Sequence, residues 1–297
     1  MGGPKHVKLK SRKFPVWLRM QVWAGSILYR GENAFGQEGQ TFRLPLNRVL
    51  KAGCHRNELD AMEFVRSRTS IPVPRVLELY EFGERYHLVM EMASSGPGEP
   101  GVDYDQMTPE QIKSFGAELG GYIQQLRQLE PPEEGVIGSV KLGKNHDSRL
   151  DNRAWGPFHG IADFHTYLRR GHPLAHWEME PDVIRVHTRP EQYSIKFTHA
   201  DLRPNNILIK DGHITAIIDW EFAGWYPEYW EYTKMRWTPS PFWDNFYKAV
   251  EQEPSIVKYP EELAAETAIW KLMHPYAYDD PPWSEENDAV QARHSAA

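Results

Sequence analysis

The chain has 297 residues, which is long enough for one large domain or two lobes around a substantial core. Its hydrophobic content of 40% and charged content of 25% are typical of a soluble globular protein, and its net charge of −7 disfavours a general nucleic-acid binder. The single cysteine, Cys54, excludes an intramolecular disulfide framework and a cysteine-rich zinc site, and it favours a reducing, cytoplasmic compartment.

The N-terminal stretch from Lys5 to Lys13 is basic, and no acid occurs before Glu32. Such a run is compatible with a targeting peptide, a membrane-surface contact or a solvated face. It lacks the long apolar segment of a signal peptide, and Pro15 interrupts an amphipathic helix, so we expect a solvated face without membrane contact. No apolar run approaches the roughly 18 residues that a transmembrane helix requires.

The pattern from Ile27 to Lys51 predicts strands joined by glycine-containing turns. Gly31, Gly36 and Gly39 would let backbone amides approach phosphates, although their spacing is not that of a GxGxxG loop. The last of these strands, at residues 48–50, ends at Lys51.

A helix follows this strand, and its apolar residues share one face: Leu59, Met62 and Val65. Glu58 lies beside that face, and Glu63 is a competing acid. A strand lysine paired with a helix glutamate is the device by which kinases hold the α- and β-phosphates. Taken alone, Lys51 and Glu58 are equally compatible with a surface lysine and a surface glutamate.

Residues 86–92 read as another strand, and the stretch 94–101 is rich in Gly, Ser and Pro, which marks a linker. Residues 108–111 then form a capping box that begins a helix. The apolar residues of this helix recur at helical spacing: Ile112, Phe115, Leu119, Tyr122, Ile123 and Leu126. A shorter helix is predicted over residues 164–170.

The stretch from Phe197 to Gly224 contains Asp201, Asn206 and Asp219. Two apolar, β-branched runs at 207–210 and 213–218 flank Asp211-Gly212, which is a strong signal for a two-residue hairpin turn. If Lys210 pairs with His213, Asn206 lies opposite Ile217, with Asp219 diagonal to it on the same face. Diagonal neighbours are about 7–8 Å apart, so both side chains could share one cation.

Mg²⁺ prefers hard oxygen ligands, few of them from protein, and Asn206 and Asp219 meet that need. Asp201, in a turn shaped by Pro204, would accept the proton of an attacking hydroxyl or orient it. Taken singly, each of these residues fits the alternative, which is a plain β-hairpin with two exposed acids and a capping Asn. The joint pattern favours a site that holds magnesium and a nucleotide while activating a hydroxyl.

The residues from His199 to Asn206 resemble the HGDxxxxN loop of the aminoglycoside phosphotransferase-like kinases, which include choline kinase-like proteins. Residues 218–221 resemble their metal-binding IDW segment, and residues 222–231 are similar to a large fungal branch. Ala200 stands where Gly is usual, and Arg203 stands where His is frequent. Neither departure removes a metal ligand or the base.

The resemblance implies an α+β, two-lobed protein-kinase-like fold, with a β-rich N-lobe at 1–93 and a mainly helical C-lobe at 94–297. It implies ATP and Mg²⁺ as cofactors, with Lys51 as the phosphate clamp and Glu58 as its orienter. Backbone groups near Glu91 and Met92 would meet the adenine, and Met90 would pack beside it. The alternative, a core strand that runs into a loop, predicts the same sequence pattern at residues 90–92.

The implied function is phosphorylation of a hydroxyl of a small molecule: an amino sugar, an amino alcohol or a secondary metabolite. C-terminal aromatics and acids suit an amine group on this acceptor, although most aromatics are expected in the core. The alternatives are a pseudokinase or ligand-binding module, which Ala200 and the irregular glycine loop favour, and a kinase-like fold recruited to non-phosphoryl chemistry. A protein kinase is disfavoured because no Ala-Pro-Glu segment follows Asp219. The sequence leaves the oligomeric state open.

Overall fold

The computed structural model describes residues 9–11, 15–28, 34–35, 41–82, 85–93, 104, 107–147, 149–210, 212–236 and 240–273. The predicted glycine loop at Gly31, Gly36 and Gly39 lies outside these residues, as does Asp211 of the predicted turn. The predicted linker at 94–101 lies outside them too, and the boundary between lobes at residue 93 therefore stays a prediction.

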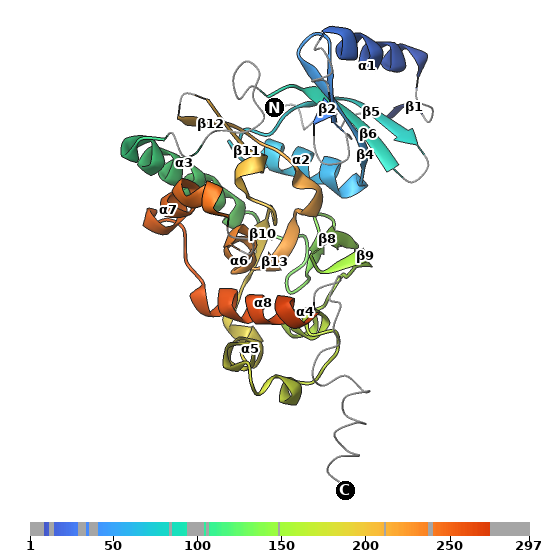
Figure 1. The fold of residues 1–297 in the computed structure, drawn as a ribbon. Helices are drawn as coiled ribbons and strands as arrows, with labels where there is room; N and C mark the ends of the chain where they lie inside the picture. Colours follow the sequence, from blue (N-terminus) through green and yellow to red (C-terminus); the bar gives the residue numbers. More distant parts are fainter. Residues whose placement is uncertain are drawn as a thin grey trace, which may run out of the picture.

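The N-terminal part is a six-stranded sheet with the strand order β1-β5-β6-β4-β3-β2 (Figure 1). Its strands are β1 Leu9–Ser11, β2 Ala34–Phe35, β3 Thr41–Leu44, β4 Arg48–Cys54, β5 Val76–Phe82 and β6 Arg85–Glu91. All neighbouring strands pair antiparallel except β1 and β5, which pair parallel. Strand β4 continues three residues beyond the predicted end at Lys51, and β6 ends one residue before Met92.

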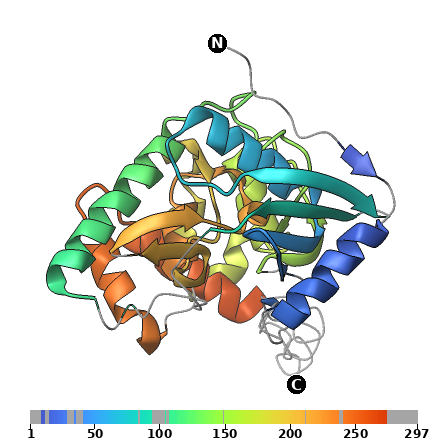
Figure 2. The same cartoon turned by 90° about the horizontal axis from the view of Figure 1, so that it is seen from above.

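Helices α1 (Val16–Leu28) and α2 (Arg56–Arg68) cover opposite faces of this sheet. Alternate strand residues point to opposite faces, and the core clusters follow that alternation. Leu79 and Leu88 pack with α2, whereas Tyr80 and Val89 pack with Leu18 of α1. Figure 2 shows α1 at the rim of the molecule.

Helix α1 corrects the prediction that Pro15 interrupts a helix and that strands begin at Ile27. The backbone amides of Leu18 and Arg19 donate to Pro15 O at 3.0 and 3.3 Å, so Pro15 starts the helix instead of breaking it. Proline is tolerated at a helix start because the first amides have no partner within the helix.

The two longer predicted helices are confirmed. In α2, Leu59, Met62 and Val65 are buried as expected. Helix α3, Pro109–Arg127, begins with the predicted capping box: Gln111 N donates to Thr108 Oγ1 at 3.3 Å, and Thr108 N donates to Gln111 Oε1 at 2.9 Å. The predicted helix at 164–170 forms at Ile161–Leu168, so it starts three residues and ends two residues earlier than predicted.

Over its described residues, the C-terminal part is mainly helical, with three small sheets (Figure 1). Its other helices are α4 Ile161–Leu168, α5 Pro181–His187, α6 Trp230–Arg236, α7 Asp244–Gln252 and α8 Pro260–Met273, with short 3-10 helices η2 Leu174–Trp177, η3 Pro190–Gln192, η4 Pro204–Asn206, η5 Trp220–Phe222 and η6 Pro241–Trp243. Its strands are β7 Gly138–Ser139, β8 Asn145–Asp147, β9 Asp151–Trp155, β10 Ile195–Thr198, β11 Ile207–Lys210, β12 His213–Ile217 and β13 Gly224–Pro227.

The predicted hairpin is present as β11 and β12, but its register differs from the prediction. Lys210 pairs with His213 as expected, whereas a bulge between Leu208 and Ile209 shifts the later pairs by one. Asn206 therefore faces Ile218, whose amide donates to Asn206 O at 2.9 Å, and not Ile217. An extra residue in one strand of a pair cannot be read from apolar alternation.

The aromatic residues after Gly224 are largely core, as expected. Tyr229, Trp230 and Phe246 have no exposed surface. Among the described residues, no helix is long and apolar enough to cross a membrane.

The packing of α1 makes a testable prediction at Gly25. A Cβ there would lie 2.2 Å from Arg43 O of β3, so Gly25→Ala should push the helix from the sheet and destabilise the protein by about 1–3 kcal/mol. The matched control is Gly121→Ala in α3, where a Cβ meets nothing within 4 Å, and which should stabilise by about 1 kcal/mol. Urea unfolding measures both, and effects of the same sign would contradict this packing.

Candidate active site

A three-stranded sheet with the order β10-β13-β7 holds both ends of the motif-bearing segment. The loop with Asp201 leaves β10, and the chain returns as β13 shortly after Asp219. The return requires close backbone approach at Gly224, where a Cβ would lie 2.3 Å from Gly138 O. Glycine is therefore the residue that fits this position.

The backbone before Asp201 is held by a buried carboxylate. Glu231, at the start of α6, accepts hydrogen bonds from the amides of His199 at 2.7 Å and Ala200 at 3.2 Å. Ala200 has φ 66°, in the left-handed region that favours glycine, and this explains why Gly is expected at its position. The alanine methyl group is fully buried in the C-terminal core, so the residue is strained in its backbone but well packed.

His199 joins the loop to the segment that precedes Asp219. Its Nδ1 accepts from the amide of Asp201 at 3.2 Å, and its Nε2 lies 3.0 Å from Ile218 O. Burial lowers the pKa of His199 to about 4, so the ring is neutral at physiological pH, with Nε2 protonated as the donor to Ile218 O. The neutral ring thus holds two parts of the site in register.

Asp201 is almost completely buried, and both of its carboxylate oxygens are contacted by neighbours. Asn206 Nδ2 donates to Oδ2 at 2.7 Å and to the backbone oxygen of Asp201 at 2.9 Å. Arg203 Nη2 donates to Oδ2 at 2.9 Å, and its Nε forms an ion-pair contact of 2.8 Å with Oδ1. Because Asn206 uses its amide nitrogen on Asp201, its Oδ1 is the atom that could serve a cation.

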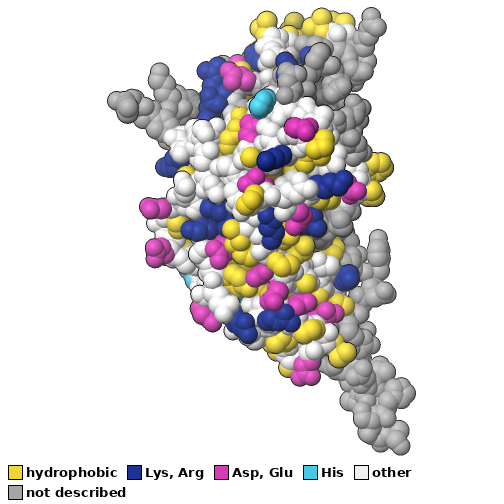
Figure 3. Space-filling model, turned by 90° about the vertical axis from the view of Figure 1, so that its left-hand side faces the viewer, with side chains coloured by type: hydrophobic (Ala, Val, Ile, Leu, Met, Phe, Trp, Pro, Cys, Tyr) yellow, Lys and Arg dark blue, Asp and Glu magenta, His cyan; other side chains and the backbone are white. Residues whose placement is uncertain are grey.

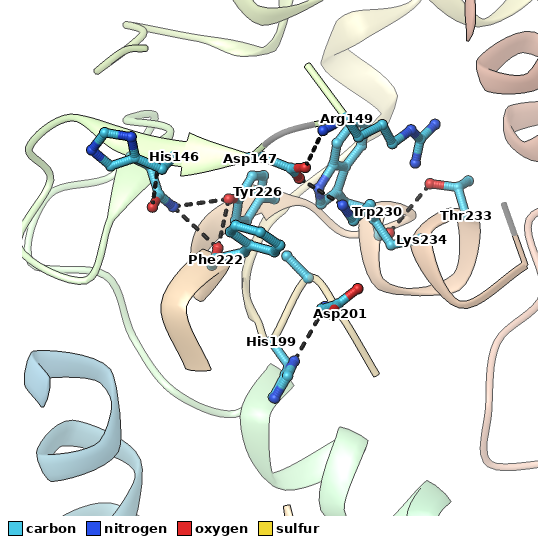
Figure 4. A network of polar contacts seen from close by, with 12 residues as sticks. His146, Asp147, Arg149, His199, Asp201, Phe222, Tyr226, Trp230, Thr233 and Lys234 are labelled. Carbon is cyan, nitrogen blue, oxygen red and sulfur yellow. Dashed lines mark hydrogen bonds and ion pairs between the residues drawn. The ribbon is translucent and has the colours of Figure 1, made fainter. Parts of the chain in front are cut away.

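A second cation lies in the buried polar network near Asp201. Lys234 is buried, and its Nζ donates to Asp147 Oδ2 at 2.7 Å. Figure 4 shows Asp147 and Lys234 on one side of Asp201, with His199 on the other. Burial raises the pKa of Asp201, while Lys234 and Arg203 act to lower it. The two cations therefore offset part of the cost of burying this carboxylate.

Lys51 connects the sheet of the N-terminal part to the segment that carries Asp219. Its Nζ donates to Glu58 Oε1 of α2 at 2.8 Å and to Asp219 Oδ1 at 2.6 Å. Burial alone would lower the pKa of Lys51, but the carboxylates of Glu58 and Asp219 outweigh it and the pKa is raised. The lysine is therefore charged, and Glu58 is the acid of helix α2 that it contacts.

Asn57 fixes α2 in the orientation that this pairing needs. Its Nδ2 lies 3.0 Å from Glu221 O, 2.8 Å from Ala223 O and 3.1 Å from Asn145 Oδ1. Its own Oδ1 accepts from the amide of Val140 at 3.3 Å. The residue before Glu58 is thus bonded to η5 and to Ala223, which directly follows η5.

Carboxylates outnumber cations at the centre of the site. One oxygen each of Glu58, Asp219 and Glu221 lies within 4.8 Å of the others. Glu58 Oε2 is buried and has no hydrogen-bond partner among the described residues. Burial and then the charge of Asp219 raise the pKa of Glu221 to about 7. Hard oxygen donors with uncompensated negative charge fit a divalent cation such as Mg²⁺.

The predicted adenine-binding residues lie at the end of β6. Met90 packs against the large core cluster that includes α2. The amides of Glu91 and Met92 donate to Arg75 O and Asn47 O, both at 3.0 Å, so these two N–H groups are already used by the protein. Any hydrogen bonds between adenine and the backbone of Glu91 or Met92 would therefore have to use the carbonyl groups of these residues.

Comparison with known proteins identifies the family. The model of the phosphotransferase enzyme family, APH, matches residues 41–265, about three quarters of the chain. The chain belongs to this family. No curated protein sequence matched it.

Solved structures agree with this phosphotransferase assignment at the level of the fold. The crystal structure of aminoglycoside phosphotransferase APH(4)-Ia superimposes with a TM-score of 0.53 at 17% identity, over 86% of this chain and 87% of that one. A thermostable mutant in a ternary complex with ADP and hygromycin B gives 0.51 at 16%, over 86% and 90%. The GDP and kanamycin complex of APH(2")-IIia gives 0.55 at 11%, over 89% and 92%. The predicted kinase-like α+β fold is confirmed.

Three residues that position the site of this phosphotransferase could not be predicted from the sequence. Glu231, Asn57 and Lys234 act across long sequence separations, and nothing in their local sequence marks them. His199 and Glu221 were within recognised motifs, and their adjacency to Asp201 and Asp219 was the signal that could have identified them.

Glu231 makes the stability of this phosphotransferase depend on pH. Burial raises the pKa of Glu231 from 4.5 to about 7, although the two amides act to lower it. The folded state therefore binds more protons than the unfolded chain between these values, and the free energy of unfolding falls as pH rises through this window. Glutamine is neutral throughout and can still accept a hydrogen bond.

We therefore expect Glu231→Gln to gain stability relative to the parent chain between about pH 5 and about pH 8. Thermal unfolding without nucleotide across this range measures the difference. The exposed Glu178, changed to Gln, is the control and should leave the profile unaltered. A constant difference between Glu231→Gln and the parent would contradict the raised pKa.

Proposed function

We propose that this protein transfers the γ-phosphoryl group of ATP, in a magnesium-dependent reaction, to a hydroxyl group of a small molecule. The observation that carries the proposal is the position of Lys51, whose Nζ contacts both Glu58 and Asp219. A lysine so placed can reach from a helix glutamate toward nucleotide phosphates. The family match and the fold of enzymes solved with ADP or GDP support the same reaction.

Asp201 is proposed as the residue that accepts or orients the proton of the acceptor hydroxyl. Its carboxylate is fixed by Asn206 and Arg203, so its position is set before substrate arrives. Lys234 and Arg203 counter the rise in the pKa of Asp201 caused by burial, which favours the ionised form that a base requires.

Asp219 and Oδ1 of Asn206 are proposed to hold Mg²⁺, with the Glu221 carboxylate in the same acidic cluster. When bound, the metal would neutralise charge on the phosphate oxygens. Lys51 would clamp the phosphates while Glu58 orients its ammonium group, and the carbonyl groups near Glu91 and Met92 would meet the adenine.

The acceptor is proposed to be a hydroxylated small molecule, with amines among the candidates. Two cavities in the C-terminal part, of 680 and 990 Å³, are large enough for such ligands, but neither is lined by Asp201 or Asp219. Because Tyr229 and Trp230 are fully buried, an aromatic cage for an amine would need other side chains.

One observation favours a ligand-binding module with weak catalysis as the second candidate. Arg203 contacts both carboxylate oxygens of Asp201, where it competes with an acceptor hydroxyl. The two candidates share nucleotide binding and differ in turnover, so the next two experiments separate them.

Nucleotide binding should depend on Asp219. ATP with Mg²⁺ at about 100 times its Kd should stabilise the parent chain by about 2.7 kcal/mol and raise its Tm by about 5 °C. Asp219→Ala should lose this gain, whereas Asp182→Ala, at a surface carboxylate of α5, should keep it. Absence of any shift in the parent chain at millimolar nucleotide would contradict both candidates.

Turnover should depend on Asp201. A mass-spectrometric screen of hydroxylated metabolites for an added phosphoryl group would reveal the acceptor. With that acceptor, Asp201→Ala should keep the nucleotide-dependent shift in Tm and lose about 10²–10⁴-fold in kcat. Asn205→Ala, at an exposed neighbour of Asn206, is the control. Undiminished turnover in Asp201→Ala would refute the assignment of Asp201 as the base. A parent chain without turnover would favour the ligand-binding module.

A further inference from the structure

Helix α1 is attached to the sheet through one narrow face. Leu18 is fully buried against Leu44, Tyr80 and Val89, and Val22 packs against the same cluster. Gly25 sits so close to β3 that its Cα faces the backbone of Arg43. Residues at positions i, i+4 and i+7 share one side of a helix, so these contacts define the inward face of α1.

The opposite face of α1 is apolar and open to solvent. Its residues are Val16, Met20, Trp23 and Ile27, with exposed fractions of 73, 62, 64 and 57%. Their spacing of four, three and four residues places them in one stripe, opposite the inward face. Leu28, 62% exposed, lies beside this stripe at the end of the helix and is not part of it. We call these four residues the outward face of α1.

A solvated surface helix normally turns polar side chains outward. Isolated exposed apolar residues are common, whereas a contiguous stripe that includes tryptophan marks a contact surface. Figure 3 shows hydrophobic side chains at the top of the molecule, at the height that α1 occupies in Figure 1. Helix α1 lies at the end of the molecule away from α5 and α8, so this surface is accessible to a large partner (Figure 1).

The charge of the sequence around α1 indicates which partner fits. Residues 1–31 contain seven Lys and Arg residues and no Asp or Glu. The rest of the chain contains the other 27 basic residues and all 41 acidic ones, a net charge of −14. A positively charged apolar segment on an otherwise acidic protein is attracted to a negatively charged surface with an apolar interior.

We propose that the outward face of α1 docks the protein on an anionic membrane surface, with the helix lying in the interfacial plane. Trp and aliphatic side chains on one face are typical of helices that lie in this layer, where basic residues add attraction to anionic lipids. Arg19 is the basic residue within α1, and the other six basic residues of 1–31 flank the helix in the sequence. Tryptophan favours the boundary between headgroups and acyl chains, which suits Trp23. The proposal adds peripheral binding to a chain predicted to have no membrane contact, and it does not depend on the proposed function.

Other occupants fit less well. A second copy carries the same excess of basic residues in its positions 1–31, so charge complementarity does not favour it as the partner of α1. An acidic protein groove would match the charge, but a groove covers one stripe, whereas α1 also exposes Trp17 and Leu28 at its sides. Both occupants are outcomes of the test.

The test is co-sedimentation of the full chain with vesicles. Vesicles of phosphatidylcholine with roughly three parts in ten of phosphatidylserine should bind at least about tenfold more protein than phosphatidylcholine alone. Met20→Glu combined with Trp23→Glu should lower binding by about tenfold or more. The matched control is Met179→Glu, at an exposed methionine of the C-terminal part, which should bind like the parent. An unchanged Tm would show that the double variant is folded.

A second measurement uses a conservative variant. Lipids with brominated acyl chains should quench tryptophan fluorescence of the bound parent chain, and Trp23→Phe should bind normally but lose much of the quenching. No binding to anionic vesicles, equal binding to neutral ones, or full binding by the double variant would overturn the proposal. A parent chain that dimerises through α1 without binding vesicles would overturn it in favour of a second copy.

Discussion

The contact of 2.6 Å between Lys51 Nζ and Asp219 Oδ1 joins residues 168 positions apart in the chain and connects the N-terminal sheet to the segment between β12 and η5. It forms only if β4 and α2 are placed correctly relative to η5. The polar bonds of Asn57 and the contact of Ile217 N with Pro72 O, 2.8 Å long, provide that placement. The geometry of the site therefore depends on the contacts between the N-terminal and C-terminal parts, and neither part would form the site by itself.

The cost of burying charge explains much of the remaining architecture. Asp147 and Glu231 are buried acids, and each is satisfied by a specific partner: Lys234 in one case and two backbone amides in the other. Removing one partner of a buried charge is more costly than never burying the pair. These residues thus constrain α6 and β8 to positions that also fix the loop around Asp201.

The sequence predicted the parts of the site that local patterns record. Asp201, Asn206 and Asp219 were proposed from a hairpin signal and a motif. Lys51 and Glu58 were proposed from the family resemblance, because a strand followed by a helix is equally compatible with surface residues. Three features could not be predicted, each for a physical reason. The bulge in β11–β12 inserts a residue that apolar alternation does not mark, α1 has apolar residues on two faces, and Glu231 acts through a contact that only the folded chain creates. Ala200 shows the converse: its motif position was recognised in the sequence, but the left-handed backbone that makes Gly the usual residue there is visible only in the structure.

The contacts of Arg203 with Asp201 have a consequence for the proposed reaction when nucleotide is bound and no acceptor molecule is present. Water is small enough to enter any site that accepts a hydroxyl, and a free carboxylate would activate it as readily as an alcohol. With both oxygens of Asp201 engaged by Arg203 and Asn206, a water molecule must displace a charged partner before it can be activated. An acceptor that binds through many groups can supply that energy, whereas a single water cannot. In the reaction proposed above, with Asp201 as the base, the arginine would thus restrain futile hydrolysis of a bound nucleotide.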